Sequence, residues 1–345
     1  MSKELLKIAV LGGGSFGTVI ANISAEKGHD VRQWMRSEDS AKDINIDHVN
    51  SRYLPGYKLA PSLVAYTDMA IALKEVDIVF VSIPSRSVRS VVAKAASYLT
   101  GQVKIVSTTK GIESDTFKMM SQVIADELPN LQIGVLSGPN FAKELAQKQL
   151  TATVIASKHE GLRADIQQLL HRQYFRIYAS DDIYGVELGG VLKNIYAIAS
   201  GMSEAMGMGE NTRSMLLTRA LAEMGRFAVS MGANPLTFLG LAGVGDLVAT
   251  CTSSLSRNYR VGFALGQGQT LEQAVAELGQ VAEGVNTVKL VRDKALELDV
   301  YMPLVEGLYE VIYQGAAPRK LAKSMMLSQQ GSDVEFVLPV DNSTF

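Results

Sequence analysis

Lys193 has the clearest chemical potential in this sequence, because its ammonium group stands inside an otherwise apolar and small-residue segment. Leu192 precedes it, and the run from Ile195 to Gly201 follows it. Burial weakens the hold of a lysine on its proton, and a second cation such as Lys110 weakens it further, which favours proton transfer. Two interpretations stay open: Lys193 is a proton donor and acceptor, or its amine reaches water along the helix surface.

Ser256, Arg257 and Asn258 form a second candidate site, where a loop passes into a segment with helical periodicity. An arginine, an amide and the N–H groups of a helix start make a good phosphate receptor. The same three residues would also suit an ordinary helix cap. Asp246 follows a glycine-rich stretch, and it is either a turn residue or the acceptor that orients Lys193 or a substrate hydroxyl.

Gly12, Gly14 and Gly17 have the G-x-G-x-x-G spacing of a dinucleotide-binding turn. The first glycine permits a tight turn, the second lets the backbone approach a pyrophosphate, and the third lets helix and strand pack closely. The helix start then offers N–H groups and partial positive charge to the phosphates. A glycine-rich turn without a ligand is the alternative, but the position between the apolar run Ile8–Leu11 and a helix favours dinucleotide binding.

The residues that follow the second predicted strand, Met35 and Arg36, bear on the type of dinucleotide. Sites that prefer NAD usually place an acid there for the ribose 2′-hydroxyl. This chain has Arg36, whose guanidinium can bind a 2′-phosphate through two hydrogen bonds. We therefore expect NADP(H) or NAD(H) as the cofactor, with NADPH slightly favoured; the alternative is a solvated arginine on a loop.

Short β-branched runs alternate with longer helical patterns in the first half of the chain. This alternation predicts an α/β domain with a doubly wound (Rossmann-like), mostly parallel sheet covered by helices on both faces. The segments Ser107–Gly111 and Ser137–Glu144 then lie at the carboxyl edge, where open sheets bind ligands. The predicted strands are Ile8–Leu11, His29–Trp34, Ile78–Ser82, Lys104–Ser107, Ile133–Leu136, Thr151–Ile155 and Phe175–Tyr178.

The pattern changes after Asp181, because long stretches rich in alanine, leucine, methionine and glutamate replace the β-branched runs. We expect a dinucleotide-binding domain over residues 1–184, an all-helical domain for substrate binding and catalysis over 185–330, and a polar tail over 331–345. Asp181 and Asp182 can cap the first helix of the second domain. The predicted helices are Gly185–Met202, Thr212–Met231, Asn258–Gly266, Thr270–Leu278, Asn286–Leu298 and Pro303–Tyr313.

The composition excludes several classes of protein. A formal net charge of −2 leaves no basic excess for binding nucleic acid or an anionic membrane. The single cysteine, Cys251, excludes an internal disulfide, and with four scattered histidines it leaves no spacing typical of a metal site. No apolar run approaches the ~20 residues that span a bilayer, and the N-terminus lacks a signal-peptide core. We expect a cytoplasmic protein.

Short motifs spread along the chain form a set that is far more specific than any one of them. They are Gly12–Gly17, Asn50–Gly56, Thr109–Gly111, Ser137–Ala142, Leu192–Asn194, Gly245–Leu247, Thr250–Thr252, Ser256–Asn258 and Val281–Gly284. In order and spacing the set resembles the bacterial NAD(P)-dependent glycerol-3-phosphate dehydrogenases, up to about residue 320.

The resemblance implies roles for individual residues. Lys193 corresponds to the proton donor and acceptor, Lys110 to a second active-site cation, and Asp246 to their carboxylate partner. Asn140 stands where many bacterial members have serine or threonine, so its contact stays open. The implied cofactor contacts are Gly12, Gly14, Ser15, Phe16, Gly17, Arg36, Lys110, Ala142, Arg257, Val281 and Glu283. The implied substrate contacts are Lys110, Gly138, Asn140, Lys193, Asn194, Asp246, Ser256, Arg257 and Asn258, the last two on a phosphate.

The resemblance also implies a reversible hydride transfer between NAD(P)H and dihydroxyacetone phosphate, which yields sn-glycerol 3-phosphate for glycerophospholipid synthesis. It further implies a homodimer. The amine of Lys193 would then lie close to the reduced nicotinamide. Arg257 would also suit a carboxylate, so a related two-domain dehydrogenase of hydroxy acids or sugar acids stays as an alternative. A non-catalytic NAD(P)-sensing protein is a more distant one, because it would not need Lys110, Lys193 and Asp246.

Overall fold

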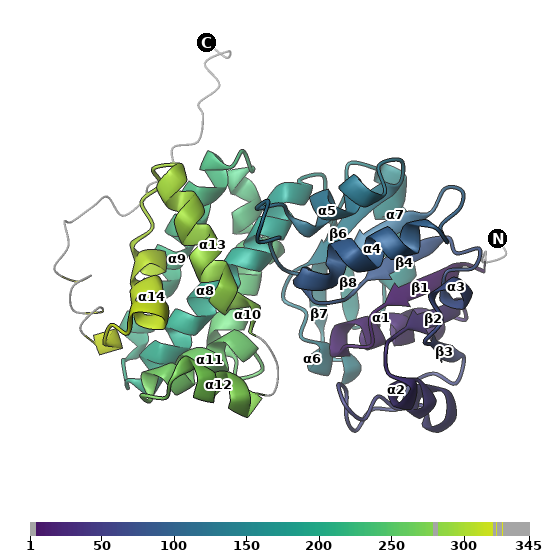
Figure 1. Ribbon diagram of the computed structural model, residues 1–345, viewed down its shortest axis with the longest axis horizontal. Helices are drawn as coiled ribbons and strands as arrows, with labels where there is room; N and C mark the ends of the chain where they lie inside the picture. The colour runs from purple at the N-terminus through teal and green to yellow at the C-terminus, as the bar shows by residue number, and fades with distance from the viewer. Residues whose placement is uncertain (1–4, 279–281, 320–321, 323–325, 327–345) are drawn as a thin grey trace, which may run out of the picture. The chain divides into compact units, whose positions relative to one another are not determined.

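The chain divides by its internal contacts into two compact units, Met1–Gly190 and Val191–Phe345. The computed structural model describes residues 5–278, 282–319, 322 and 326 (Figure 1). The division falls inside the first helix that we assigned to the second domain. The boundaries at 184 and 330 therefore stay predictions, and the predicted tail over 331–345 lies outside the described residues.

Unit 1 is built on one eight-stranded sheet with the order β3-β2-β1-β4-β5-β6-β7-β8. Neighbouring strands are parallel except β6 and β7. Ile8 and Val10 of β1 belong to one buried cluster, whereas Ala9 and Leu11 belong to another. Because successive side chains of a strand point to opposite faces, the sheet has an apolar core on each side. The strands are β1 (Lys7–Leu11), β2 (Asp30–Trp34), β3 (Leu63–Tyr66), β4 (Ile78–Val81), β5 (Lys104–Ser107), β6 (Gln132–Ser137), β7 (Thr151–Ala156) and β8 (Phe175–Ser180).

The structure confirms the predicted fold class, a mostly parallel α/β sheet followed by helices. Each predicted strand segment coincides with an observed strand, with ends that differ by at most two residues. Strand β3 was not predicted from the sequence; it is a four-residue edge strand in which Val64 is exposed. The helices that cover the sheet are α1 (Ser15–Ala25), α2 (Glu38–Lys42), α3 (Met69–Ala72), α4 (Val88–Ala96), α5 (Met120–Glu127), α6 (Ala142–Ala146) and α7 (Glu160–Leu170).

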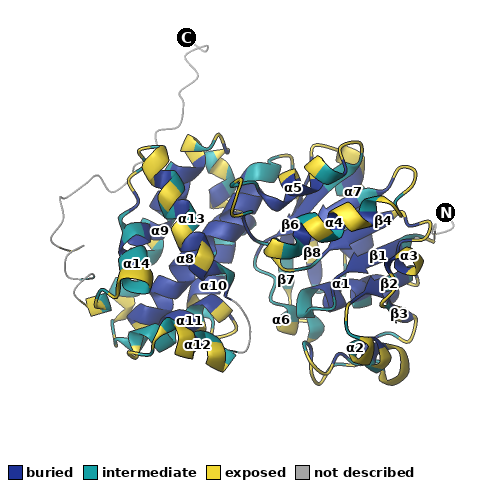
Figure 2. Cartoon of the chain, viewed as in Figure 1, coloured by how far each residue is buried: buried dark blue, intermediate teal, exposed yellow. Residues whose placement is uncertain are grey.

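Helix α8 (Ile183–Ala205) begins in unit 1 and continues into unit 2. Its start is capped as predicted, because Oδ1 of Asp182 accepts the N–H of Gly185 at 2.9 Å. Figure 2 shows α8 as a mostly buried helix, unlike the amphipathic α4. The remaining helices are α9 (Glu210–Ser230), α10 (Asp246–Thr252), α11 (Arg257–Gly266), α12 (Leu271–Leu278), α13 (Glu283–Glu297) and α14 (Pro303–Gln314).

Within unit 2, α8 and α11 pack backbone against backbone. A Cβ atom on Gly262 would clash with the carbonyl oxygen of Ile198, and one on Gly201 would clash with that of Tyr259. Glycine is therefore required on both helices at the crossing, and any larger residue would separate them. Helix α10 was not predicted from the sequence, because the preceding π-helical turn, Leu241–Gly245, is rich in glycine. Among the described residues, no helix combines the length and apolar character needed to cross a bilayer.

Glu223 is a buried carboxyl of α9 that caps the start of α14. Its Oε1 accepts the N–H of Leu304 at 2.6 Å, and its Oε2 accepts the N–H of Val305 at 3.4 Å. The hydroxyl of Tyr196 donates to Oε2 at 3.1 Å. Burial raises the pKa of Glu223 to about 7, and these hydrogen bonds offset only part of that shift. The folded protein therefore holds this proton up to neutral pH.

The stability of the protein should fall as Glu223 ionises. The pKa of Glu223 in the folded protein, about 7, lies above the ordinary value of 4.5. The protonated carboxyl therefore contributes its full stabilisation below pH 4.5, and this stabilisation is lost as the pH rises through 7. Glu223→Gln mimics the protonated carboxyl. We expect the free energy of unfolding to drop between acid and neutral pH by on the order of 3 kcal/mol more in the wild type than in the variant. Urea unfolding at each pH measures this free energy, and parallel pH profiles for the wild type and the variant would contradict the expectation.

Candidate active site

The glycine turn between β1 and α1 forms a backbone cradle. Gly12 has φ +129°, and a Cβ there would clash with the carbonyl oxygen of Ser82, so only glycine suits the turn. A Cβ on Gly17 would lie 2.8 Å from the carbonyl oxygen of Gly12, which shows how closely α1 follows the strand. Gly14 differs, because a Cβ there would meet nothing within 4 Å. Open space therefore lies in front of the turn, where the first N–H groups of α1 begin.

Side chains behind the turn hold its carbonyl groups. Nε2 of Gln33 donates to the carbonyl of Gly12 at 2.8 Å, and Nδ2 of Asn50 donates to that of Gly13 at 2.9 Å. Both amides also donate to Oγ1 of Thr18, at 3.0 and 2.8 Å. With its carbonyls fixed at the back, the turn presents N–H groups at the front. This arrangement fits an anionic dinucleotide.

The predicted cofactor contacts near this turn occupy different environments. The hydroxyl of Ser15 donates to the carbonyl of Tyr53 at 2.6 Å, which leaves its backbone N–H as the group at the helix start. Phe16 is half-buried against the core, and Arg36 is exposed just beyond the carboxyl end of β2. Because β1 and β2 are parallel, their carboxyl ends share one edge of the sheet. Val281, another predicted contact, lies outside the described residues.

Lys110, Gly138 and Asn140 lie at the same edge, beyond β5 and β6. Nζ of Lys110 donates to the carbonyl of Gly138 at 3.3 Å. Nδ2 of Asn140 donates to Oγ1 of Thr153 at 3.0 Å, and that hydroxyl donates to the carbonyl of Ser137 at 2.9 Å. The side chain of Asn140 is therefore fixed against β7. Ala142, a predicted cofactor contact, is the first residue of α6 at this edge.

The start of α8 approaches Lys110 closely. A Cβ on Gly190 would lie 2.5 Å from Oγ of Ser137 and 3.7 Å from Cδ and Cε of Lys110. Gly190 leaves room for the lysine side chain, which is a packing role that the sequence analysis did not assign. Gly190 and Lys193 are three residues apart on one continuous helix, so they share a face of α8.

Lys193 is buried, and its amine is held by α10. Nζ forms an ion pair with Oδ1 of Asp246 and donates to Oγ1 of Thr250 at 2.7 Å. The side chains of Lys193 and Asp246 are 7% and 2% exposed, which rules out an amine that extends to bulk water. Asp246 is the first residue of α10 and not a simple turn residue. The neighbouring Cys251 is fully buried, and burial raises the pKa of its thiol, so the cysteine stays protonated beside the pair.

The starts of α11 and α13 meet next to Lys193. Oγ of Ser256 accepts the N–H of Tyr259 at 3.2 Å, so this serine caps α11. A helix cap was the alternative to a phosphate site for this segment. Oδ1 of Asn258 accepts the N–H of Gly284 at 3.0 Å, and a Cβ on Gly284 would lie 2.7 Å from the carbonyl oxygen of Asn194. Asn194, Asn258 and Gly284 therefore bring three helices together. Arg257 is exposed at the first position of α11, and Glu283 begins α13.

A glycine turn at the carboxyl edge of a doubly wound sheet is typical of dinucleotide-binding proteins. Comparison with known proteins narrows this class. Residues 7–163 match the description NAD-dependent glycerol-3-phosphate dehydrogenase N-terminus, and residues 182–323 match the C-terminus of the same enzyme. Together these segments cover most of the chain.

Individual relatives agree with the family match. The chain is 56% identical to the glycerol-3-phosphate dehydrogenase [NAD(P)+] of Acinetobacter baylyi, over 98% of this chain and 94% of the relative. It is 57% identical to that of Pseudomonas fluorescens, over 96% of each. The crystal structure of glycerol-3-phosphate dehydrogenase from Coxiella burnetii superposes with a TM-score of 0.89 at 36% identity, over 93% of this chain and 99% of the other. The chain belongs to the NAD(P)-dependent glycerol-3-phosphate dehydrogenase family and is an oxidoreductase, which excludes a non-catalytic sensor.

Asn50 offers a test of the cradle, because it holds the glycine turn from behind. We expect Asn50→Ala to weaken NADPH binding roughly 5- to 10-fold, since the loss of its two donated hydrogen bonds releases the carbonyl of Gly13. Fluorescence titration with NADPH measures the affinity. Asn45→Ala is the control. The amide of Asn45 also forms two hydrogen bonds, one to the carbonyl and one from the N–H of Ala65, but these lie away from the glycine turn. Equal affinities of the two variants would contradict a positioning role for Asn50.

Proposed function

We propose that this enzyme reduces dihydroxyacetone phosphate to sn-glycerol 3-phosphate, reversibly, with NADPH or NADH. The observation that carries the proposal is the buried pair of Lys193 and Asp246 in a chain whose relatives bear that enzyme name over nearly their full length. A buried charge pair is costly to a fold and is therefore a mark of function more than of stability. We also propose a cytoplasmic homodimer that supplies glycerophospholipid synthesis, on the strength of the resemblance alone.

The glycine turn is the proposed holder of the cofactor. The N–H groups of Gly14, Ser15 and Phe16 would bind the pyrophosphate, while the closely packed Gly12 and Gly17 shape the turn. Arg36 would bind a 2′-phosphate, which is the basis for expecting use of NADPH. Ala142, Arg257, Val281, Glu283 and Lys110 are the further contacts that the resemblance implies. When bound, the reduced nicotinamide supplies the hydride that adds to C2 of the ketone.

Lys193 is the proposed general acid. As negative charge develops on the C2 oxygen, Nζ donates a proton to it, and Asp246 with Thr250 keeps the amine in place throughout. In the reverse direction the neutral amine accepts the proton from the C2 hydroxyl. Lys110, whose amine lies at the carboxyl edge, stabilises the same developing charge. General acid catalysis of this kind typically contributes ~10²–10⁴-fold to the rate.

The start of α11 is the proposed phosphate site. Arg257 offers a guanidinium, and the ten-residue helix offers its N-terminal N–H groups. Because Oδ1 of Asn258 is bound to Gly284, its Nδ2 is the end that can donate to a phosphate oxygen. Anchoring the phosphate positions the ketone, so binding energy far from C2 assists the reaction. Gly138, Asn140, Asn194 and Ser256 complete the proposed substrate contacts, and no metal is proposed.

The direct test is the loss of absorbance at 340 nm when the purified protein meets dihydroxyacetone phosphate with NADPH, and then with NADH. Turnover with this ketone and none with 2-oxo acids supports the proposal. Turnover with oxo acids or sugar acids alone would favour the hydroxy-acid or sugar-acid dehydrogenase alternative.

Lys193→Met should lower kcat by at least ~10³-fold, because it removes the proton donor together with one partner of a buried ion pair. The affinity for NADPH should stay within about twofold of the wild type, which separates loss of chemistry from loss of folding. Lys294→Met is the matched control, because Lys294 also pairs with a carboxylate, that of Glu297 at 2.6 Å, on α13. A Lys193→Met variant with the turnover of the control would refute the assignment.

Arg36→Ala should weaken NADPH binding roughly 10- to 100-fold and leave NADH binding unchanged, since a hydrogen-bonded charge pair with the 2′-phosphate is lost. Comparing the dissociation constants of the two cofactors provides an internal control for folding. Equal affinity of the variant and the wild type for NADPH would mean that Arg36 is only a solvated loop residue.

A further inference from the structure

The loop that carries Lys110 joins β5 to α5 over residues 108–119. Local contacts hold its two ends. Oγ1 of Thr109 donates to the carbonyl of Ile83 at 2.8 Å, and Ile112 pairs with Met119 in an isolated antiparallel bridge. The residues between Ile112 and Met119 form a small turn. In it Phe117 has φ +57°, a conformation that is costly for a bulky side chain. The turn therefore needs support from the elements around it.

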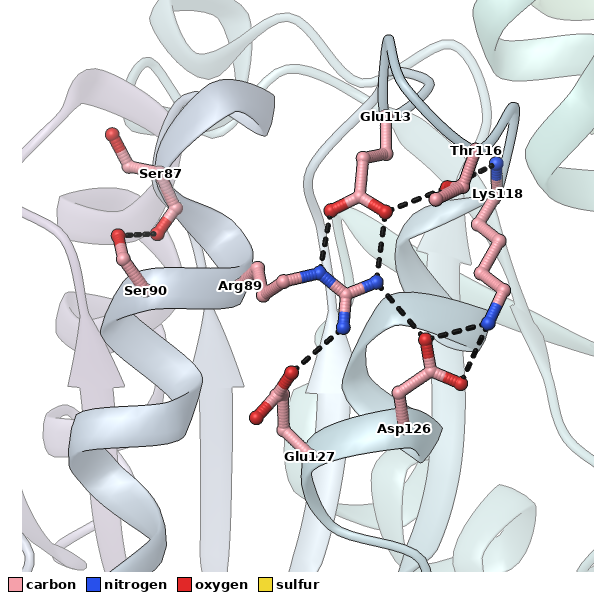
Figure 3. Close-up of polar contacts among 8 residues, drawn as sticks. All are labelled: Ser87, Arg89, Ser90, Glu113, Thr116, Lys118, Asp126 and Glu127. Carbon is pink, nitrogen blue, oxygen red and sulfur yellow. Dashed lines mark hydrogen bonds and ion pairs between the residues drawn. The ribbon is translucent and has the colours of Figure 1, made fainter.

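Arg89 of α4 provides such support, as Figure 3 shows. Its Nε donates to Oε1 of Glu113 and its Nη2 donates to Oε2, each at 2.7 Å, so the guanidinium and the carboxylate form a bidentate pair. Its Nη1 donates to Oε1 of Glu127 at 2.7 Å, and Nη2 also donates to Oδ2 of Asp126 at 2.9 Å. One guanidinium thus joins three elements: α4, the turn and α5.

The turn has two further bonds to this cluster. Oγ1 of Thr116 donates to Oε2 of Glu113 at 2.6 Å, and Nζ of Lys118 lies 2.7 Å from Oδ2 of Asp126 (Figure 3). Both sides of the turn are therefore bound to charges that Arg89 gathers. We call this group of Arg89, Glu113, Thr116, Lys118, Asp126 and Glu127 the Arg89 cluster.

The Arg89 cluster is only partly exposed, and its central pair of Arg89 and Glu113 stays charged near neutral pH. The hydrogen bonds that Arg89 donates to Glu113 lower the pKa of this carboxyl to about 2. The side chains of Arg89 and Glu113 are 36% and 19% exposed. A single ion pair at such a surface contributes little to stability, but a fork-to-fork pair fixes direction as well as distance. The geometry suits a clamp on a loop more than a general stabiliser.

Helix α5 connects the cluster to α8. The N–H of Ser121 donates to Oε1 of Glu187 at 2.9 Å, and its hydroxyl donates to Oε2 of the same carboxyl. Glu187 lies on α8, three residues before Gly190, which packs beside the methylene groups of Lys110. The element that Arg89 binds is thus bound in turn to the helix against which the Lys110 side chain rests.

We propose that Arg89 is a positioning residue for Lys110: by clamping Glu113 to α4 and α5, it fixes the loop so that the Lys110 amine is held at the carboxyl edge, ready to meet the developing charge. The inference rests on the role proposed for Lys110 in the reduction of dihydroxyacetone phosphate. Arg89 is not among the substrate and cofactor contacts proposed above. Displacement of a positioned group by about 1 Å can cost up to ~10²-fold in rate.

A double-mutant cycle tests the proposal on the full-length protein. Arg89→Ala should lower kcat/KM for dihydroxyacetone phosphate roughly 10- to 100-fold, and Glu113→Gln, a milder change, should act in the same direction. Lys110→Met should lower it by ~10²-fold or more. Because Arg89 acts through Lys110, adding Arg89→Ala to Lys110→Met should lower kcat/KM by no more than about twofold further. NADPH affinity should be unchanged in Arg89→Ala and in Glu113→Gln.

Arg292→Ala is the matched control, because Arg292 also forms a two-point pair, with Glu306 at 2.9 and 3.1 Å, on a helix far along the chain from this loop. It should lower the melting temperature as much as Arg89→Ala does, without changing kcat/KM. Multiplicative effects of Arg89→Ala and Lys110→Met would overturn the proposal and leave the function intact. Wild-type kinetics of Lys110→Met would overturn both this inference and the role of Lys110, whereas an inactive wild type would refute the proposed function.

Discussion

The buried ion pair between Lys193 and Asp246 is the constraint around which the helical unit is organised. Removing two charges from water costs several kcal/mol for each ion, and the mutual attraction repays this only when the geometry is good and the remaining protons are bonded. Thr250 meets that need by accepting a hydrogen bond from the amine. An apolar pair of similar volume would often stabilise a fold better. The retention of charge here is therefore best explained by chemistry that needs a proton.

Close helix packing holds this pair in place. Gly201 and Gly262 let α8 and α11 touch through their backbones, and Gly284 lets α13 begin against Asn194. Backbone contacts have little freedom to adjust, because no side-chain rotamer can absorb an added methyl group. The position of Lys193 relative to Asn258 is thus set by the absence of side chains at three glycines.

Much of this arrangement was predictable, because the relevant signals are local. β1 and the glycine turn follow from a buried run and a fixed spacing, and Lys193 was conspicuous as a charge within an apolar helix. Its partner Asp246 lies 53 residues away, and the sequence offered that pairing only as one of two interpretations. Helix α10 was missed because it is only seven residues long and directly follows the glycine-rich turn Leu241–Gly245, where glycine has low helix propensity.

The residues that position the site were not predictable in the same way. Gln33, Asn50 and Arg89 are ordinary polar residues. Their importance arises from partners 15 to 38 residues distant, some of them backbone carbonyls that carry no sequence signature. Gln33 donates a hydrogen bond to the carbonyl of Gly12. The glycine motif predicts the turn, but it does not indicate which side chains hold the turn in place. Glycine gives the turn its shape but cannot make it rigid, because the residue has the greatest backbone freedom to lose. A site built on backbone atoms therefore requires side chains behind it, and these can be identified only when the fold shows which carbonyls they reach.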